Sequence, residues 1–122
     1  MELNGREINF AYNMRAAKML VDISPERDLS RLGDALTGKY GNAIENQARL
    51  IVALSTAYCL SSDHKAEGLQ PVTMDEVLDL DPETFRDLFM AASNAFVDGQ
   101  KTNVRTKPAP RKKAGTQPEN QS

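Results

Sequence analysis

The stretch that most constrains the fold is AIENQARLIVALSTAYCL, residues 43–60. Its apolar residues recur three and four positions apart, which is the spacing of one face of an α-helix. A stripe this wide is typical of a helix covered on two sides. We therefore predict a central helix over residues 43–60, whose stripe comprises Ile44, Ala48, Leu50, Ile51, Val52, Leu54, Ser55, Tyr58 and Cys59.

The first twelve residues predict a small β-hairpin. Asn4-Gly5 is a strong two-residue turn, because both residue types tolerate positive φ. Ile8, Phe10 and Tyr12 then alternate with polar or small residues, as they would on a half-buried strand. An isolated hairpin is marginal in water, so we expect this one to lean on helices or to pair with another chain.

Two further helices are predicted before the central one. Asn13 is a good N-cap for a first helix, whose face would carry Met14, Ala17, Leu20 and Val21. Ser24-Pro25 would open a second helix, in the favoured order of cap and then proline. That helix would end at Gly38, and the residues along its apolar side would be Leu29, Leu32 and Leu36.

Two more helices follow the polar loop SSDHKAEG. Thr73 and Glu76 have the spacing of a capping box, which predicts a short helix ending near Leu80. Asp81-Pro82 is the start signal of a last helix. We predict that this last helix ends at Gly99.

The last helix carries an apolar stripe that holds three of the four phenylalanines. Its members are Phe85, Leu88, Phe89, Ala92 and Phe96. Burial of such a stripe contributes on the order of 6–12 kcal/mol before entropy is subtracted, which favours a place in the protein's own core. The alternative is a surface for another chain, open at Met90 and Phe96, so we treat all six residues as candidate partner-binding residues.

Charge divides the chain into two parts. Residues 1–100 hold nine Lys/Arg and sixteen Asp/Glu, a net charge of −7, whereas residues 101–122 hold six Lys/Arg and one Glu, a net charge of +5. The second part has three prolines and no aromatic residue, so it has too little apolar area to offset the entropy of ordering. We predict a helical domain over residues 1–100 and a disordered basic tail over residues 101–122.

The sequence contains no recognisable catalytic, cofactor or metal signature. The single histidine, His64, lies in a polar loop beside Asp63, and no nucleophile has a reason to be near it. The single cysteine, Cys59, excludes an internal disulfide and fits a buried thiol. Neither a calcium-loop nor a phosphate-loop spacing is present. We therefore expect no catalytic residue, no cofactor and no metal ligand.

Together these patterns predict a mainly α fold. A short N-terminal β-hairpin would precede a bundle of four or five helices, and a basic tail would follow. No run is long and apolar enough to span a bilayer, and the N-terminus lacks an apolar signal core. A cytosolic protein is the resulting expectation.

The order of these parts resembles the phage tail assembly chaperones of siphophage type. The opening LNGREINFAYNMRAAKML is similar to the hairpin and first helix of that family, and ARLIVALSTAYCLSS is similar to its middle helix. The third similar segment is VTMDEVLDLDPETFRDLFMAASNAF. The resemblance covers residues 2–98, except for residues 22–42, which match no part of the family's pattern.

This resemblance implies a non-enzymatic protein of the host cytoplasm that leaves before the tail is finished and is absent from the mature virion. Its partners would be the tape measure protein, which it keeps soluble, and tail tube subunits, which it helps to recruit. It also implies a longer product made by ribosomal frameshifting, with Lys112-Lys113 as a candidate site for a slippery run. Self-association stays open, and neither membrane nor nucleic acid is an expected partner.

Two other functions stay open. One is a small cytosolic adaptor or regulatory protein whose basic tail contacts nucleic acid. The other is an accessory subunit of an enzyme, without chemistry of its own. Salt separates the first of these from a chaperone, because binding to a nucleic-acid backbone weakens steeply as salt rises and apolar binding does not.

Overall fold

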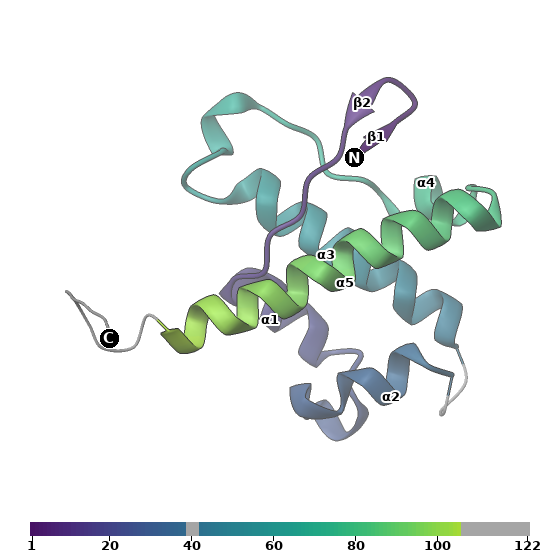
Figure 1. Ribbon diagram of the computed structural model, residues 1–122, viewed down its shortest axis with the longest axis vertical. Helices are drawn as coiled ribbons and strands as arrows, with labels where there is room; N and C mark the ends of the chain where they lie inside the picture. The colour runs from purple at the N-terminus through teal and green to yellow at the C-terminus, as the bar shows by residue number, and fades with distance from the viewer. Residues whose placement is uncertain (39–41, 106–122) are drawn as a thin grey trace.

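The fold is mainly helical. The computed structural model describes residues 1–38 and 42–105, with the backbone alone for residues 101–105. Within these residues it has a two-stranded antiparallel hairpin and five α-helices (Figure 1). The helices are α1 (Met14–Val21), α2 (Leu32–Leu36), α3 (Ala43–Leu60), α4 (Met74–Leu78) and α5 (Pro82–Arg105). The predicted fold class is thus confirmed.

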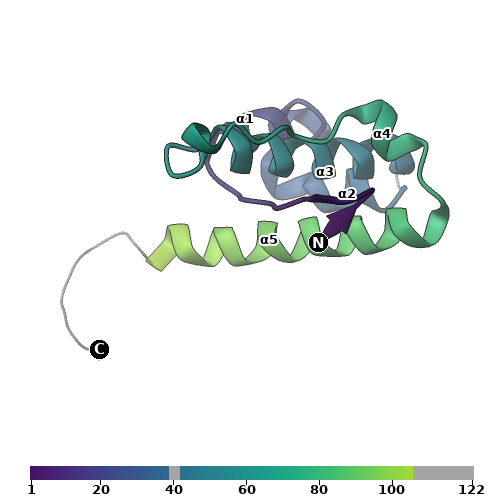
Figure 2. The same ribbon diagram turned by 90° about the horizontal axis from the view of Figure 1, so that it is seen from above.

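The helices form two layers. Figure 2 shows α5 lying alone below the layer that contains α1, α2, α3 and α4. The extended N-terminal segment runs between the layers, since the Ala11 amide donates to the Leu54 carbonyl of α3 at 3.1 Å and Tyr12 packs edge-on against Phe96 of α5. The chain's first residues therefore form part of the packing between the layers.

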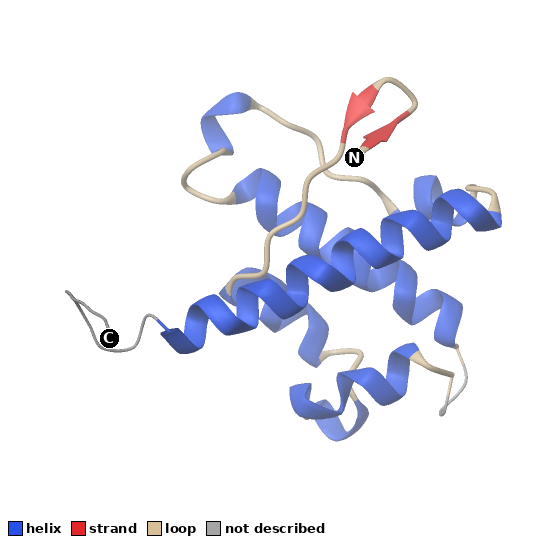
Figure 3. Ribbon diagram, viewed as in Figure 1, coloured by secondary structure: helices blue, strands red, loops and turns tan. Residues whose placement is uncertain are grey.

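The hairpin is shorter than the sequence predicts. β1 (Glu2–Leu3) pairs with β2 (Arg6–Glu7) across Asn4-Gly5, whose φ values of 53° and 78° confirm the predicted turn (Figure 3). The strand predicted to run through Tyr12 stops at Glu7, although the Ile8 amide still donates to the Met1 carbonyl at 2.6 Å. The alternation nevertheless predicts correctly which side chains of this segment pack on the core. They are Ile8, Phe10 and Tyr12.

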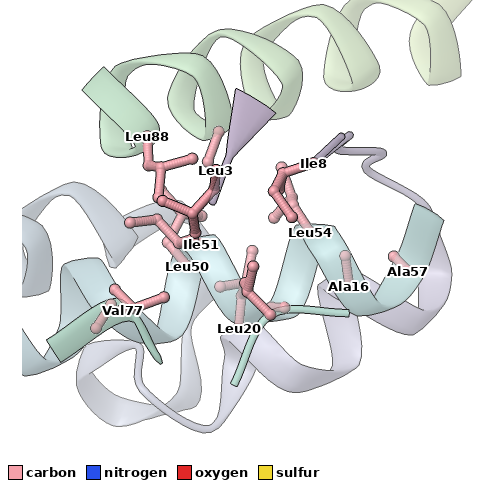
Figure 4. Close-up of a cluster of buried hydrophobic side chains, with 14 of the residues drawn as sticks. Leu3, Ile8, Ala16, Leu20, Leu50, Ile51, Leu54, Ala57, Val77 and Leu88 are labelled. Carbon is pink, nitrogen blue, oxygen red and sulfur yellow. The ribbon is translucent and has the colours of Figure 1, made fainter. Parts of the chain in front are cut away.

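The core is centred on α3, as predicted. Figure 4 shows Leu50, Ile51 and Leu54 of α3 among side chains from the hairpin and from the other helices. All three are fully buried. The buried side chains that surround them include Leu3, Ile8, Ala16, Leu20, Leu32, Val72, Val77, Leu88 and Ala92.

The helix α1 is capped as predicted, and Ala17 and Leu20 of its predicted face are buried. The Asn13 side chain accepts from the Ala16 amide at 3.2 Å. The predicted face is wrong at Met14, which is 79% exposed. Ala16, Ala17 and Leu20 are the residues that face the core, and at about 100° per residue Met14 lies on the opposite side from Ala16.

The predicted second helix is broken into three pieces. Ser24 does not cap it, since its hydroxyl donates back to the Leu20 carbonyl at 2.8 Å. Glu26 and Arg27 both have a φ of 56°, which interrupts a right-handed helix. Two short 3-10 helices, η1 (Pro25–Arg27) and η2 (Leu29–Arg31), therefore precede α2. Gly38, with a φ of 87°, follows the end of α2 as predicted.

The helix α3 has the predicted bounds, Ala43–Leu60, but its first turn is not buried. Ile44 was expected in the buried stripe and is 65% exposed. Ile44 is exposed because α2 packs further along α3. There, Asn46 and Gln47 donate to the Ala35 and Leu36 carbonyls at 3.1 and 2.8 Å. The loop after α3 contains a 3-10 helix, η3 (Lys65–Glu67).

The last two helices begin where the sequence predicts. The Thr73–Glu76 capping box is formed and starts α4, and Asp81 accepts from the Thr84 amide at 3.1 Å at the start of α5. Gly99 does not end α5, which continues to Arg105. The predicted tail therefore begins too early, since residues 101–105 are helical, and the rest of it lies outside the described residues.

Candidate functional site

An apolar hollow of the described surface lies where α4 meets α5. It has a volume of about 270 Å³. Two of its lining side chains are strongly exposed, Ile44 at 65% and Leu78 at 49%. We call it the Ile44–Leu78 groove, and its lining residues are Ile44, Gln47, Leu78, Leu80, Pro82 and Phe85.

Local sequence signals build this groove. The capping box fixes the start of α4, and the Asp81 cap with Pro82 fixes the start of α5. Only residues 79–81 connect the two helices. The Leu80 amide donates to the Val77 carbonyl at 3.3 Å, which keeps the connection tight. Leu78, Leu80 and Pro82 are therefore held together beside the first turn of α3, where Ile44 stands.

The same connection carries a high density of negative charge. Asp79, Asp81 and Glu83 alternate with Leu80 and Pro82 along the chain. In the part of the chain that the structure describes, none of these three carboxylates forms an ion pair, and neither does Asp75. We call residues 75–83 the acidic stretch.

Hydrogen bonds keep parts of the acidic stretch ionised. Bonds from the side chain and the backbone of Thr84 lower the pKa of Asp81. The backbone amide of Thr73 lowers the pKa of Glu76, and Arg6 lowers it further. Arg6 Nη2 and Glu76 Oε1 are 3.1 Å apart. Glu76 is thus the one member of the acidic stretch with a basic partner among the described residues.

Five of the six candidate partner-binding residues on α5 lie in the core or pack against it. Leu88 and Ala92 are fully buried in the core. Phe85, Phe89 and Phe96 are half-buried and pack against that core. Of these, Phe85 also lines the Ile44–Leu78 groove, and the Phe96 ring lies 4.8 Å from that of Tyr12 in an edge-on arrangement.

Met90 is set apart from the other five candidates. It is 53% exposed, and it lies about 140° around α5 from Phe85 at about 100° per residue. The described structure therefore does not bring Met90 into the groove. The groove residues that the sequence analysis missed as candidates are Ile44, Gln47, Leu78, Leu80 and Pro82.

Two other hollows are more polar in character. One, of about 220 Å³, includes two methionines, Met19 and Met74, beside Asp22 and Arg49. Both charged groups already have partners, since Arg27 pairs with Asp22 at 2.9 Å and Glu45 pairs with Arg49 at 2.7 Å. The other, of about 410 Å³, lies between η1 and α3 and includes the Glu26–Arg31 ion pair.

His64 contacts Glu67 and Tyr58. Its Nδ1 lies 3.1 Å from Glu67 Oε2, and its ring stacks on Tyr58 with centroids 4.0 Å apart. Within residues 1–38 and 42–105, no three His, Cys, Asp or Glu side chains form a group that could hold a metal ion.

Cys59 is buried, as expected, at 7% exposure. Its burial raises the pKa of the thiol, although Arg6 and a hydrogen bond with Ser55 act in the opposite direction. None of the helices described here has the length and apolar character needed to cross a membrane.

Comparison with protein-family models, with curated proteins and with solved structures gave no match to this chain.

Proposed function

We propose that the protein is a phage tail assembly chaperone that binds and solubilises a tape measure protein and helps to recruit tail tube subunits. In this role it works without catalysis, in the host cytoplasm, and leaves before the virion is complete. It uses apolar surface to cover a client until assembly proceeds. The resemblance of residues 2–98 to that family supplies the identity of the client.

The observation that carries the proposal is the combination of exposed apolar surface and net negative charge. Ile44, Leu78 and Met90 are each about half exposed or more. A holding chaperone needs such surface for its client. It also needs charge to stay soluble when it is empty, and residues 1–100 carry a net charge of −7.

The order of elements also supports the proposal. A hairpin leads into a helix, a central helix follows, and a capping box precedes a long last helix. This is the order of parts on which the family resemblance depends. Residues 22–42, which the resemblance does not cover, contain η1, η2 and α2.

Where a long helical protein is encoded downstream, co-expression of that protein with this chain tests the proposal. We expect that protein to be insoluble when it is expressed alone and soluble when it is co-expressed with this chain. Affinity capture on a tag should then recover the two proteins together, and the complex should persist as salt is raised, because apolar contacts are not screened. Persistent insolubility in the presence of this chain would refute the client assignment.

The adaptor that contacts nucleic acid is the alternative, and the +5 charge of residues 101–122 is the observation that favours it. Its test is binding of the full chain to DNA and RNA over a range of salt. The chaperone proposal predicts weak binding that disappears at physiological salt. Tight binding that is lost when residues 106–122 are deleted would favour the alternative.

The proposed longer product can be tested on the gene itself. A slippery repeat at the codons of Lys112-Lys113, followed by an overlapping reading frame, is expected. Mass spectrometry of the expressed gene should then detect peptides from both frames. Codons without a slippable repeat in this region would remove this part of the proposal and leave client binding untouched.

A further inference from the structure

The Ile44–Leu78 groove and the acidic stretch lie at the same place on the molecule. Leu78, Leu80 and Pro82 line the groove. Asp79 and Asp81 are their immediate neighbours in the chain, and both are exposed. A partner that covers these apolar side chains would therefore bring the residues that flank its own apolar surface close to carboxylates.

The carboxylates beside the groove are not neutralised by an arginine. Asp79, Asp81 and Glu83 form no ion pair within the described residues. Asp22 and Glu45, by comparison, pair with Arg27 and Arg49. Unpaired charge of one sign beside an apolar hollow selects for a partner of the opposite sign.

The walls of the groove indicate the backbone conformation of that partner. They come from the helices α3, α4 and α5 and from the short connection at Leu80. Helices satisfy their backbone hydrogen bonds internally, so they offer no free edge to an extended peptide. A partner helix, whose backbone is likewise satisfied, fits such a groove through side chains one turn apart.

The basic end of α5 lies far from the groove. Glu83 and Arg105 are separated by 22 residues of α5, which is about 33 Å at about 1.5 Å per residue. The backbone at Arg105 is therefore distant from the carboxylates beside the groove of its own molecule.

We infer that the Ile44–Leu78 groove binds an amphipathic helix of the client whose apolar stripe is flanked by Lys or Arg. This inference rests on the proposed function and deepens it, because it names the class of client segment. The apolar stripe covers Ile44, Leu78 and Phe85, and the flanking cations lie opposite Asp79, Asp81 and Glu83.

Two synthetic peptides of about 20 residues test the inference. Both carry the same leucine stripe at helical spacing in an alanine background, and the flanking positions are Lys in one peptide and Glu in the other. We expect the Lys peptide to bind the full chain at least about tenfold more tightly at low salt. Raising the salt to about 0.5 M should shrink that difference. Equal binding of the two peptides would overturn the inference.

Variants of the groove locate the binding. The double variant Ile44→Ser and Leu78→Ser should weaken binding of the Lys peptide by about tenfold or more. Val97→Ser changes a side chain that is 46% exposed and does not line the groove, and it should leave binding within about twofold. The changed side chains are exposed, so circular dichroism should show each variant folded. Unchanged binding by the double variant, or a larger loss from Val97→Ser, places the partner elsewhere.

Charge variants test the acidic stretch separately. Asp79→Asn with Glu83→Gln should weaken Lys-peptide binding about three- to tenfold at low salt. The control, Glu2→Gln with Asp63→Asn, changes the net charge equally at exposed residues that do not line the groove and should have less than about a twofold effect. An equal loss in both variants would show a general charge effect and overturn the local role.

The two proposals fail in distinguishable ways. If the groove variants solubilise the client as well as the wild type does, the groove inference fails and the chaperone function stands. If the wild type does not solubilise the client, the function fails whatever the peptides do. Sedimentation of the full chain tests whether a second copy of this chain occupies the groove instead. If the chain is a dimer, and the double variant Ile44→Ser and Leu78→Ser dissociates that dimer without changing peptide binding, the groove is a self-interface and the inference is overturned.

Discussion

The backbone of Gly99 approaches Tyr12 so closely that a Cβ atom at Gly99 would lie 2.6 Å from the Tyr12 Cβ. No real side chain accepts a contact that short, so one of the two segments would have to move. Gly99 therefore marks the point where α5 crosses the N-terminal segment. Its role is close packing between layers, and the helix continues through it to Arg105.

Gly99→Ala is expected to destabilise the protein by about 1–3 kcal/mol, because the added methyl group overpacks against Tyr12. In a helix without such a contact, the same change usually stabilises. Gly33 of α2 provides the control, since a Cβ there would meet no atom within 4 Å. Gly33→Ala should be stabilising by about 0.4–1 kcal/mol. Urea unfolding followed by circular dichroism measures both, and stabilisation by both changes would show that the crossing is looser than described.

Leu88→Ala is expected to cost about 2–5 kcal/mol, because Leu88 is fully buried and its truncation leaves a cavity in the core. Met90→Ala, two residues further along the same helix and 53% exposed, should change stability by less than about 0.5 kcal/mol. Thermal unfolding of the two variants against the wild type provides the comparison. Similar losses in both would mean that α5 buries a different face.

Glu76→Gln is expected to lower stability at neutral pH by less than about 1 kcal/mol, because the pair with Arg6 is partly exposed. The pKa of Glu76 is lower in the folded protein than its ordinary value of 4.5. Its carboxylate therefore stabilises the fold above that value, and this contribution is lost as the pH falls through the folded pKa.

The pH dependence of the Glu76→Gln effect is the sharper measurement. The difference from the wild type should be present near neutral pH and should vanish well below pH 4.5, where Glu76 is protonated in both states. The urea unfolding midpoints of the variant and the wild type over this pH range measure that difference. If Glu76→Gln is still less stable than the wild type well below pH 4.5, the loss is due to the shape of the side chain and not to its charge. Gln retains an oxygen that can accept from the Thr73 amide.

Cys59 is expected to react with a thiol reagent roughly a hundredfold more slowly in the native protein than in urea-unfolded chain. Burial limits access to the sulfur, and the raised pKa of the thiol reduces the thiolate fraction. Spectrophotometric thiol titration at neutral pH measures the rate. The reaction should accelerate in destabilised variants such as Leu88→Ala, and an equally fast reaction in the native state would contradict the burial of Cys59.

Local signals in the sequence were sufficient for most element boundaries. Asn4-Gly5, the Asn13 cap, the Thr73–Glu76 capping box and Asp81-Pro82 all occur where the structure has a turn or a helix start. Each depends on hydrogen bonds or φ preferences within a few residues. Such interactions are encoded by neighbouring side chains and need no knowledge of the rest of the fold.

Local signals were insufficient to predict which part of an apolar helix face is buried. Met14 and Ile44 have the residue type and spacing of core positions, and both are largely exposed. Periodicity predicts that a helix has an apolar face but not how far its neighbours extend along it. The candidate site shows the same limit: Phe85 was identified as a candidate partner-binding residue, whereas Ile44 and Leu78 join it only through the meeting of α3, α4 and α5.

The sequence by itself determined that this chain folds as helices around residues 43–60, with a hairpin turn at Asn4-Gly5, because caps, turns and apolar spacing act over short distances. Tertiary structure alone decided that Gly99 packs on Tyr12 rather than ending a helix, and that an apolar groove opens beside the acidic stretch. Both outcomes depend on which distant surfaces come into contact. Steric fit between layers, rather than local preference, is their physical cause.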